Sequence, residues 1–230
     1  MNKRIKAIAF IGCLTAFLFC FSGYAETLFS DDLSTLRHFK NIYSSVPTVS
    51  WITDGNNAVF TGGAASSDRA RLESAEEFKF MKQGTTYKSV TLTFTSRIDK
   101  ITEGRFEIGL IEAKSVRKYN NPLFLKNDMY GAVVCHTSSS NPLGLLFNAG
   151  DGTAPGPTAN DIGTAAVTGE HTYSVVFTPT GTELFRDGES QGTTGRTLDF
   201  SKRYKIAVFG QGRSSNSKQL GQIDLNVSIQ

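Results

Sequence analysis

The sequence predicts an all-β protein, a two-sheet antiparallel β-sandwich of the jelly-roll type. Three observations predict this fold class. Apolar and polar residues alternate along many short segments, which is the period of a strand with one buried face. Gly, Asn, Asp and Pro separate these segments at turn positions. We find no convincing long helical pattern, internal repeat or domain linker, so one β-sandwich domain is expected.

The clearest strand pattern lies in residues 171–189, HTYSVVFTPTGTELFRDGE. Its first arm alternates between aromatic or aliphatic residues and mostly hydroxyl-bearing residues as far as Thr178. A Pro-Thr-Gly turn then leads to a second arm, 182–186. The dipeptide Asp187-Gly188 favours a type I′ hairpin turn. The segment therefore predicts strand, turn, strand, tight turn and strand.

The rest of the chain repeats this pattern more weakly. Further strands are predicted over 26–33, 48–53, 58–61, 70–72, 86–98, 105–111, 129–136, 143–147, 204–209 and 221–229. Residues 34–43 carry apolar residues at roughly helical spacing and predict either a short helix or a loop. Residues 115–127 and 149–169 lack alternation and are predicted loops.

The hairpin and the two ends of the chain also carry a family resemblance. The hairpin sequence, LFSDDLS at 28–34 and IDLNVSI at 223–229 resemble the corresponding strands of concanavalin A-like (laminin G-like) lectin/glucanase domains. The resemblance implies a jelly roll whose opening and closing strands pair. Residues 35–85 carry no matching signature. This fold hosts lectins, glycosidases, lyases and interaction modules, so function must be argued from a site.

Residues 1–25 are predicted to be a signal peptide, and residues 26–230 the concanavalin A-like domain. A basic segment, 2–6, precedes an apolar run over 7–21, and small residues end at Ala25. The apolar run is shorter than the roughly 20 residues that a spanning helix needs. We therefore expect a secreted or periplasmic protein with no membrane span after signal removal.

Charge and cysteine content exclude several classes of function. Signal removal takes three of the 24 basic residues and none of the 21 acidic ones, so no net basic field remains to attract nucleic acid. Cys135 is then the only cysteine left, which excludes an intramolecular disulfide and a metal site built on cysteines. The family resemblance implies a polysaccharide, a glycan or a cell-surface protein as partner.

Glu107 and Glu112 are the candidates for catalysis. Glucanases of glycoside hydrolase family 16 carry Glu-x-Asp-x-x-Glu or Glu-x-Asp-x-Glu on one strand, and a retaining mechanism needs the two Glu carboxylates about 5 Å apart. In this chain Gly109 stands where that motif has Asp. Residues 107 and 112 point to opposite faces of a regular strand, so only a β-bulge would bring both to one cleft. We favour an ordinary strand.

Sugar binding needs a flat aromatic face surrounded by polar groups. Trp51, the only tryptophan, is either such a stacking platform or a core residue. Tyr130 and His136 occupy alternate positions of one predicted strand, so they share a face. Glu107 joins them if its face is the concave one. Trp51, Glu107, Tyr130 and His136 are the candidate ligand-binding residues.

The resemblance also implies a structural calcium between the opening and closing strands, and no other cofactor. Asp224 stands at the ligand position of the closing strand, and Asp31 or Asp32 approaches from the opening strand. Ligation by oxygen atoms alone suits calcium. The alternative for these residues is a solvated acid on an outer face.

Together these observations favour an exported, non-catalytic module that binds carbohydrate or another surface ligand. One alternative is a divergent glycoside hydrolase or polysaccharide lyase that uses Glu107 and Glu112. Another is a structural or protein-interaction module without a small-ligand site.

Overall fold

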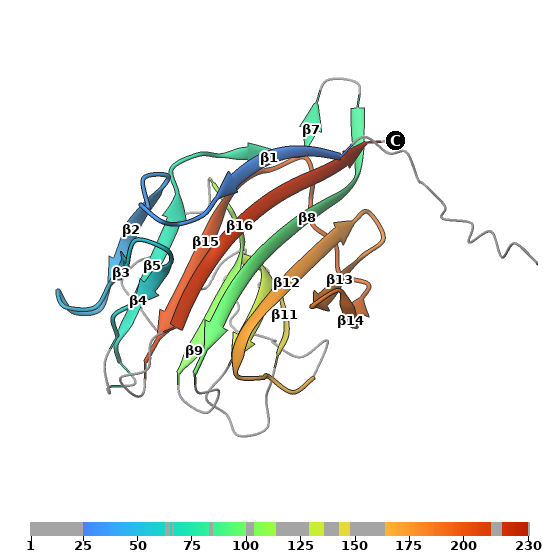
Figure 1. The fold of residues 1–230 in the computed structure, drawn as a ribbon. Coiled ribbons are helices and arrows are strands. Elements are labelled where there is room, and N and C mark those ends of the chain that lie inside the picture. Colours follow the sequence, from blue (N-terminus) through green and yellow to red (C-terminus); the bar gives the residue numbers. More distant parts are fainter. Residues whose placement is uncertain are drawn as a thin grey trace, which may run out of the picture.

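The computed structural model describes residues 25–62, 65, 67–82, 85–99, 104–113, 129–135, 143–147, 164–212 and 218–229. These residues form two antiparallel sheets that pack face to face, and no helix occurs among them (Figure 1). Nowhere in these ranges does a helix long and apolar enough to cross a membrane occur. The all-β sandwich prediction is confirmed. The predicted signal peptide lies outside the described residues except for Ala25.

Sheet A, the first sheet, has nine strands. They are β1 (Ala25–Asp31), β3 (Trp51–Thr53), β4 (Ala58–Phe60), β7 (Met81–Lys82), β8 (Thr85–Ile98), β12 (Gly169–Thr178), β13 (Gly181–Arg186), β14 (Glu189–Thr194) and β16 (Lys218–Ile229). Their order is β14-β13-β12-β8-β16-β4-β3, with β1 also paired to β16 and β7 to β8. The long strands β8 and β16 therefore lie at the centre of the sheet (Figure 1).

Sheet B, the second sheet, has seven strands. They are β2 (Phe39–Ser44), β5 (Arg69–Ser74), β6 (Phe78–Lys79), β9 (Arg105–Glu112), β10 (Met129–Cys135), β11 (Gly144–Phe147) and β15 (Arg203–Gln211). Their order is β11-β10-β9-β15-β5-β2, with β6 paired to β15. Strand β15 thus lies between β9 and β5, which are far apart in the sequence.

The opening and closing strands pair as the resemblance implied. β1 runs antiparallel to β16 from Ala25 opposite Ser228 to Asp31 opposite Ile223, with one register shift on the way. The hairpin is also formed as predicted, because β12, β13 and β14 follow one another in space. Asp187 and Gly188 have φ angles of 53° and 82°, both positive, as a type I′ turn requires.

Residues 34–43 form no helix: 34–38 are loop, as the second expectation has it, and the remainder is extended. They contain the start of β2, which pairs with β5 from Phe39 opposite Ser74 to Ser44 opposite Ala70. Leu36 has a φ of 52°, a left-handed conformation that a right-handed helix cannot contain. Pairing with a distant strand therefore overrides the local helical spacing. The predicted loop 115–127 lies outside the described residues, as does most of 149–169.

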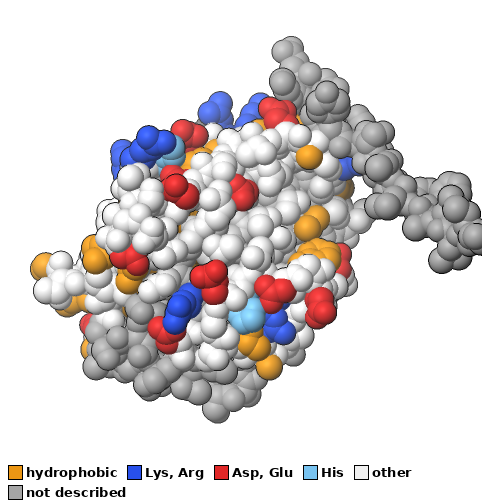
Figure 2. Space-filling model, in the orientation of Figure 1, with side chains coloured by type: hydrophobic (Ala, Val, Ile, Leu, Met, Phe, Trp, Pro, Cys, Tyr) orange, Lys and Arg blue, Asp and Glu red, His pale blue; other side chains and the backbone are white. Residues whose placement is uncertain are grey.

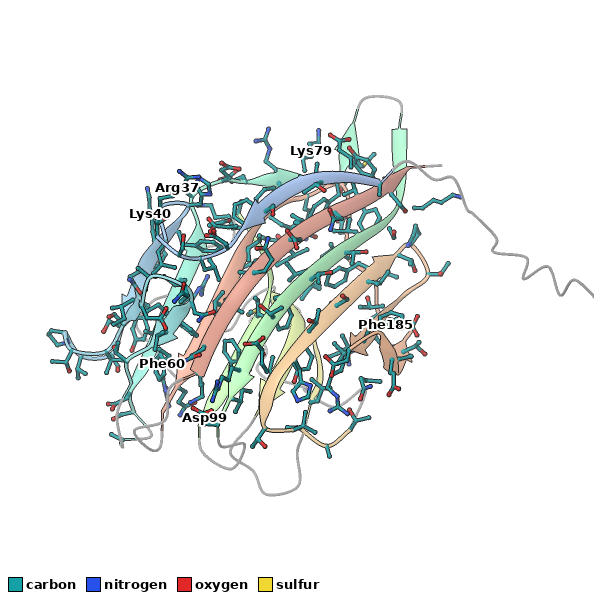
Figure 3. All side chains as sticks on the ribbon, in the orientation of Figure 1. Arg37, Lys40, Phe60, Lys79, Asp99 and Phe185 are labelled. Carbon is teal, nitrogen blue, oxygen red and sulfur yellow. The ribbon has the colours of Figure 1, made fainter. Side chains whose placement is uncertain are left out.

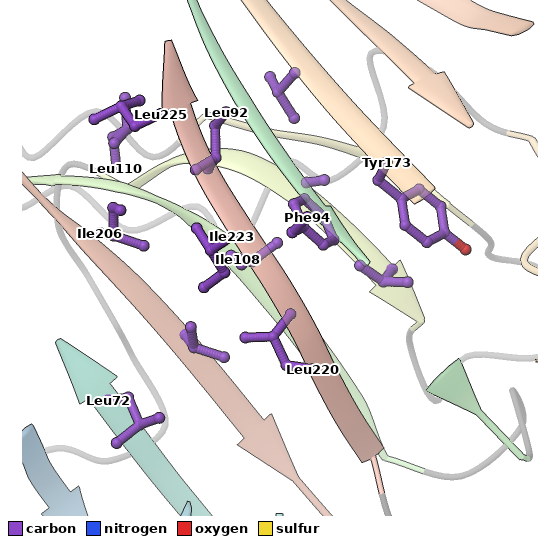
Figure 4. Close-up of a cluster of buried hydrophobic side chains, with 14 of the residues drawn as sticks. Leu72, Leu92, Phe94, Ile108, Leu110, Tyr173, Ile206, Leu220, Ile223 and Leu225 are labelled. Carbon is purple, nitrogen blue, oxygen red and sulfur yellow. The ribbon is translucent and has the colours of Figure 1, made fainter. Parts of the chain in front are cut away.

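The core lies between the two sheets and is built by the alternating residues of both (Figure 4). Each fully buried aliphatic or aromatic side chain stabilises the fold by about 1.5–3 kcal/mol relative to exposure. Sheet A contributes Leu92, Phe94, Tyr173, Leu220, Ile223 and Leu225, and sheet B contributes Leu72, Ile108, Leu110 and Ile206. The residues between these positions point away from the core, so they form the outer face of each sheet.

Candidate functional site

The outer face of sheet B carries a group of charged side chains together with an aromatic and an amide side chain. In β9 the core takes Phe106 and Ile108, so Arg105 and Glu107 point to the outer face. The same alternation applies to β5 and β15. We call the resulting set the outer cluster, and its members are Arg69, Arg71 and Glu73 on β5, Arg105 and Glu107 on β9, and Phe209 and Gln211 on β15.

Strand register arranges the outer cluster in rows across the sheet. Phe209 lies directly between Glu107 on β9 and Arg71 on β5. Gln211 lies in the same way between Arg105 and Arg69. Neighbouring strands are about 4.8 Å apart, so each row brings side chains from three strands close together.

Two ion pairs link members of the outer cluster along single strands. Arg105 Nε binds Glu107 Oε1, and Arg71 Nη2 binds Glu73 Oε1. The Glu107 and Glu73 side chains are only 2% and 1% exposed. Burial raises the pKa of Glu107, and the Arg105 guanidinium opposes that rise. The paired guanidinium groups offset the free-energy cost of burying these two carboxylates.

The Phe209 row combines an aromatic ring with a carboxylate and a guanidinium on either side. The apolar side of a pyranose ring packs against such an aromatic face, and its hydroxyl groups bond to charged groups at the edge. Sequence reasoning identified only Glu107 of this row. The signal for Arg71 is the alternation in Arg-Ala-Arg-Leu-Glu at 69–73, which places three charges on one face.

Glu107 and Glu112 point to opposite faces of sheet B. The register between β9 and β15 is continuous from Glu112 opposite Tyr204 to Arg105 opposite Gln211, without a bulge. Glu112 forms an ion pair with Lys202 instead. The two carboxylates therefore do not form the facing pair that a retaining glycosidase uses.

Trp51 lies in the core rather than on a binding face. Its side chain belongs to a residue that is 1% exposed, and its ring centroid is 5.5 Å from that of Phe60 and 5.7 Å from that of Phe106. The indole Nε1 donates a hydrogen bond to the Ala70 carbonyl at 3.3 Å. The structure thus places the tryptophan where the core interpretation expects it.

Tyr130 and Glu107 are not brought together. Tyr130 alternates with the core residue Ala132, so it points inward, and its ring packs edge-on against Tyr204 at a centroid distance of 6.0 Å. Glu107 points to the outer face of the same sheet. His136 lies outside the described residues.

Asp31 and Asp224, the expected calcium ligands, also lie on opposite faces. Asp224 points outward, and its Oδ1 accepts hydrogen bonds from Ser30 Oγ at 2.6 Å and Gln222 Nε2 at 2.8 Å. Asp31 is 8% exposed and lies opposite the core residue Ile223. Its carboxylate accepts a bond from a backbone N–H and lies 2.9 Å from His38 Nδ1.

These residues therefore do not fit the calcium site that the resemblance implied. Among the described residues no three His, Cys, Asp or Glu side chains gather closely enough to hold a metal ion. A polar cavity of about 400 Å³ opens beside Asp31, lined also by Arg37, His38 and Gln222. Arg37 lies at the connection from β1 to β2 (Figure 3).

The outer face of sheet A has a different composition. Hydroxyl and amide groups cover β8, β12, β16 and β1, and they bind one another across the strands. Thr93 and Ser174 share a hydrogen bond of 2.9 Å, and Thr27 donates to Asn226 at 2.7 Å. In Figure 2, which views this face, charged and hydrophobic side chains are sparse across the middle.

Comparison with known proteins identifies the fold. No protein-family model and no curated protein matches the chain in sequence. Among solved structures, the Emp47p carbohydrate recognition domain matches 85% of this chain and 93% of its own, with 15% identity and a TM-score of 0.62. Peanut lectin matches 90% and 99%, with 13% identity and a TM-score of 0.59.

The exoplasmic/lumenal domain of VIP36, in a Ca²⁺/Man3GlcNAc-bound form, matches 85% of this chain and 86% of its own. Its identity is 12% and its TM-score 0.57. All three match nearly their whole length while sharing little sequence, so what they have in common with this chain is architecture. The chain therefore has the concanavalin A-like jelly-roll fold of these lectin domains.

Proposed function

We propose that this protein is an exported, non-catalytic carbohydrate-binding module whose ligand binds on the outer face of sheet B. The observation that carries the proposal is the row in which Phe209 lies between Glu107 and Arg71. Fold neighbours that include a carbohydrate recognition domain and a Man3GlcNAc-bound domain support it. The signal-like sequence of residues 1–25 supports export.

Each member of the row has a role in this proposal. Phe209 is 5% exposed in this structure, so the proposal requires its ring face to become accessible for the apolar side of one sugar ring to pack against it. Glu107 accepts hydrogen bonds from sugar hydroxyl groups, and Arg71 donates to them. Because these charged groups are largely removed from water, each bond to the ligand is electrostatically stronger than at an open surface.

Glycan-array binding by the full chain tests the site. Phe209→Leu keeps an apolar side chain but removes the flat ring, and we expect it to weaken binding about fivefold or more. Thr93→Val, on the outer face of sheet A, is the matched control and should bind as the wild type does. Circular dichroism shows whether both variants remain folded. Equal binding by Phe209→Leu and wild type would place the ligand elsewhere.

The absence of catalysis is a separate part of the proposal. Reducing-sugar release from β-glucans is expected to remain at background level for both the wild type and Glu107→Gln. Release by the wild type that Glu107→Gln abolishes would instead favour the glycosidase alternative. Failure to bind any glycan, together with background release, would favour a protein-interaction module.

A further inference from the structure

We propose that the carbohydrate bound on the outer face of sheet B is anionic, and that Arg69 and Arg105 hold its carboxylate or sulfate group. This inference rests on the proposed function and deepens it by naming the class of ligand. It is carried by the row that Gln211 forms with these two arginines, which lies next to the Phe209 row.

Arg69 and Arg105 are brought to one place by the sheet topology. Arg69 begins β5 and Arg105 begins β9, and Gln211 at the end of β15 is the cross-strand partner of both. Their backbones are therefore about 10 Å apart with their side chains on the same face. Burial is the main cause that lowers the pKa of Arg69; Tyr43 opposes this shift, and the nearby positive charge of Arg105 adds to it.

The two arginines differ in their partners. Arg105 is paired with Glu107, but no described carboxylate lies within ion-pair distance of Arg69. Arg69 is only 9% exposed, and its Nε has no hydrogen-bond acceptor among the described residues. Burial removes this Nε–H from water without supplying an acceptor, so a negatively charged ligand group bound at Arg69 contributes more binding free energy than a neutral one.

The outer cluster also carries more positively than negatively charged side chains. Three arginines of the outer cluster accompany two glutamates, Glu73 and Glu107. Burial raises the pKa of Glu107, and the Arg105 guanidinium opposes that rise. The outer cluster is therefore net positive although the chain as a whole is close to neutral once residues 1–25 are left out.

The planar geometry of the guanidinium group limits which chemical groups of a ligand it binds best. Its planar fork donates two parallel hydrogen bonds to a carboxylate or to an oxyanion such as sulfate. Tyr43, Gln211 and Arg105 are half-buried, so this end of the outer face is reached from solvent. A uronic acid or sulfated sugar placed there extends its neutral part toward Phe209, one row further along the strands.

Matched glycans test the preference. We expect oligogalacturonate to bind about tenfold or more tightly than its methyl ester, or sulfated chondroitin than the desulfated chain, at low ionic strength. The pair that shows the difference identifies carboxylate or sulfate as the group. Arg69→Gln should remove this difference in affinity between the charged and the neutral glycan. Arg97→Gln, which removes a 54% exposed arginine elsewhere, is the matched control and should keep it.

Inorganic sulfate separates this inference from the proposed function. Sulfate titrated at constant ionic strength should raise the melting temperature saturably in the wild type and in Arg97→Gln, and not in Arg69→Gln. Sulfate stabilisation without glycan binding would keep the anion site and reject the carbohydrate function. Glycan binding that ignores ligand charge and the Arg69→Gln substitution would overturn the anion site while keeping the carbohydrate function.

Discussion

The outer faces of the two sheets arise from the same alternation of residues but have opposite chemistry. On sheet A, Thr93, Ser174 and Asn226 form a neutral layer of hydroxyl and amide groups in contact with solvent. On sheet B, Glu73 and Glu107 are nearly inaccessible and are held by arginines of their own strands. A period-2 pattern therefore identifies which residues point outward, and it does not identify how buried the outer face is.

The difference decides where binding energy can come from. Exposed hydroxyl groups exchange one hydrogen-bond partner for water at little net cost, about 0.5–1.5 kcal/mol per bond. Buried charges have already lost their hydration, so their interactions are strong and their loss is expensive. Each ligand contact on the outer face of sheet B therefore contributes more binding free energy. Substitutions there should also change binding and stability more than substitutions on sheet A.

The largest expected effect follows from breaking the Arg71–Glu73 ion pair. Glu73→Ala leaves the Arg71 guanidinium buried without this carboxylate, and we expect the free energy of unfolding to fall by about 3–5 kcal/mol. Urea unfolding followed by tryptophan fluorescence measures the change. Replacing both partners by apolar residues, as in Arg71→Met with Glu73→Leu, should recover most of it. A loss below about 1 kcal/mol in Glu73→Ala would mean that the pair behaves like an exposed one.

Glu107→Gln tests the burial of Glu107 on sheet B through the pH dependence of the free energy of unfolding. The folded state raises the pKa of Glu107, so the folded protein retains a proton that the unfolded chain releases above its ordinary value of 4.5. The wild type should therefore lose stability relative to Glu107→Gln as pH rises from 4.5 through the folded-state pKa. Urea unfolding at a series of pH values measures the difference. Parallel curves for the two proteins would contradict the raised pKa.

The strands with one buried face could be predicted from sequence, because alternation is local. The strands predicted over 86–98 and 221–229 follow from their own alternation, without knowing which strands lie beside them. β2 could not be predicted in this way, since its residues extend only by pairing with β5, some thirty positions away. The signal-like segment 1–25 remains a prediction.

The candidate site was harder to predict than the fold. Both faces of β5 are buried although one of them carries Arg69, Arg71 and Glu73, and local sequence does not reveal that burial. Trp51 was open to two interpretations, because a lone tryptophan serves equally as a platform or as a core residue. Only the packing of β3 and β4 against sheet B, which places Phe60 and Phe106 around its ring, decides its position.

The pKa of Asp187, on sheet A, is shifted in the opposite direction to that of Glu107 on sheet B. The Asp187 side chain is 49% exposed, yet it binds His171 Nδ1 at 2.6 Å and accepts the Thr172 N–H at 2.9 Å. The hydrogen bond from His171 is the main cause that lowers the pKa of Asp187, so its stabilisation is present above pH 3.8 and is lost as pH falls through the folded-state pKa. The direction is opposite to that expected for Glu107.

Two substitutions at Asp187 separate its charge from its backbone. Asp187→Asn keeps a residue that tolerates the φ of 53° and should cost about 1 kcal/mol at pH 7, with the difference from wild type shrinking in acid. Asp187→Ala adds the strain of a left-handed alanine, about 1 kcal/mol more. Thermal unfolding at pH 7 and pH 3 measures both. If the two variants were equally stable, the turn would carry no such strain.

The smallest effect is expected on the neutral layer of sheet A. Thr93→Val retains the β-branched shape that favours a strand and removes only the hydroxyl that bonds to Ser174. Because Ser174 is half-buried and can bond to water instead, we expect a loss of about 0.5 kcal/mol and no dependence on pH. Urea unfolding at pH 5 and pH 8 measures it. A loss comparable to that of Glu73→Ala would show that the outer face of sheet A is enclosed as well, and the contrast between the two faces would then lie in their charge alone.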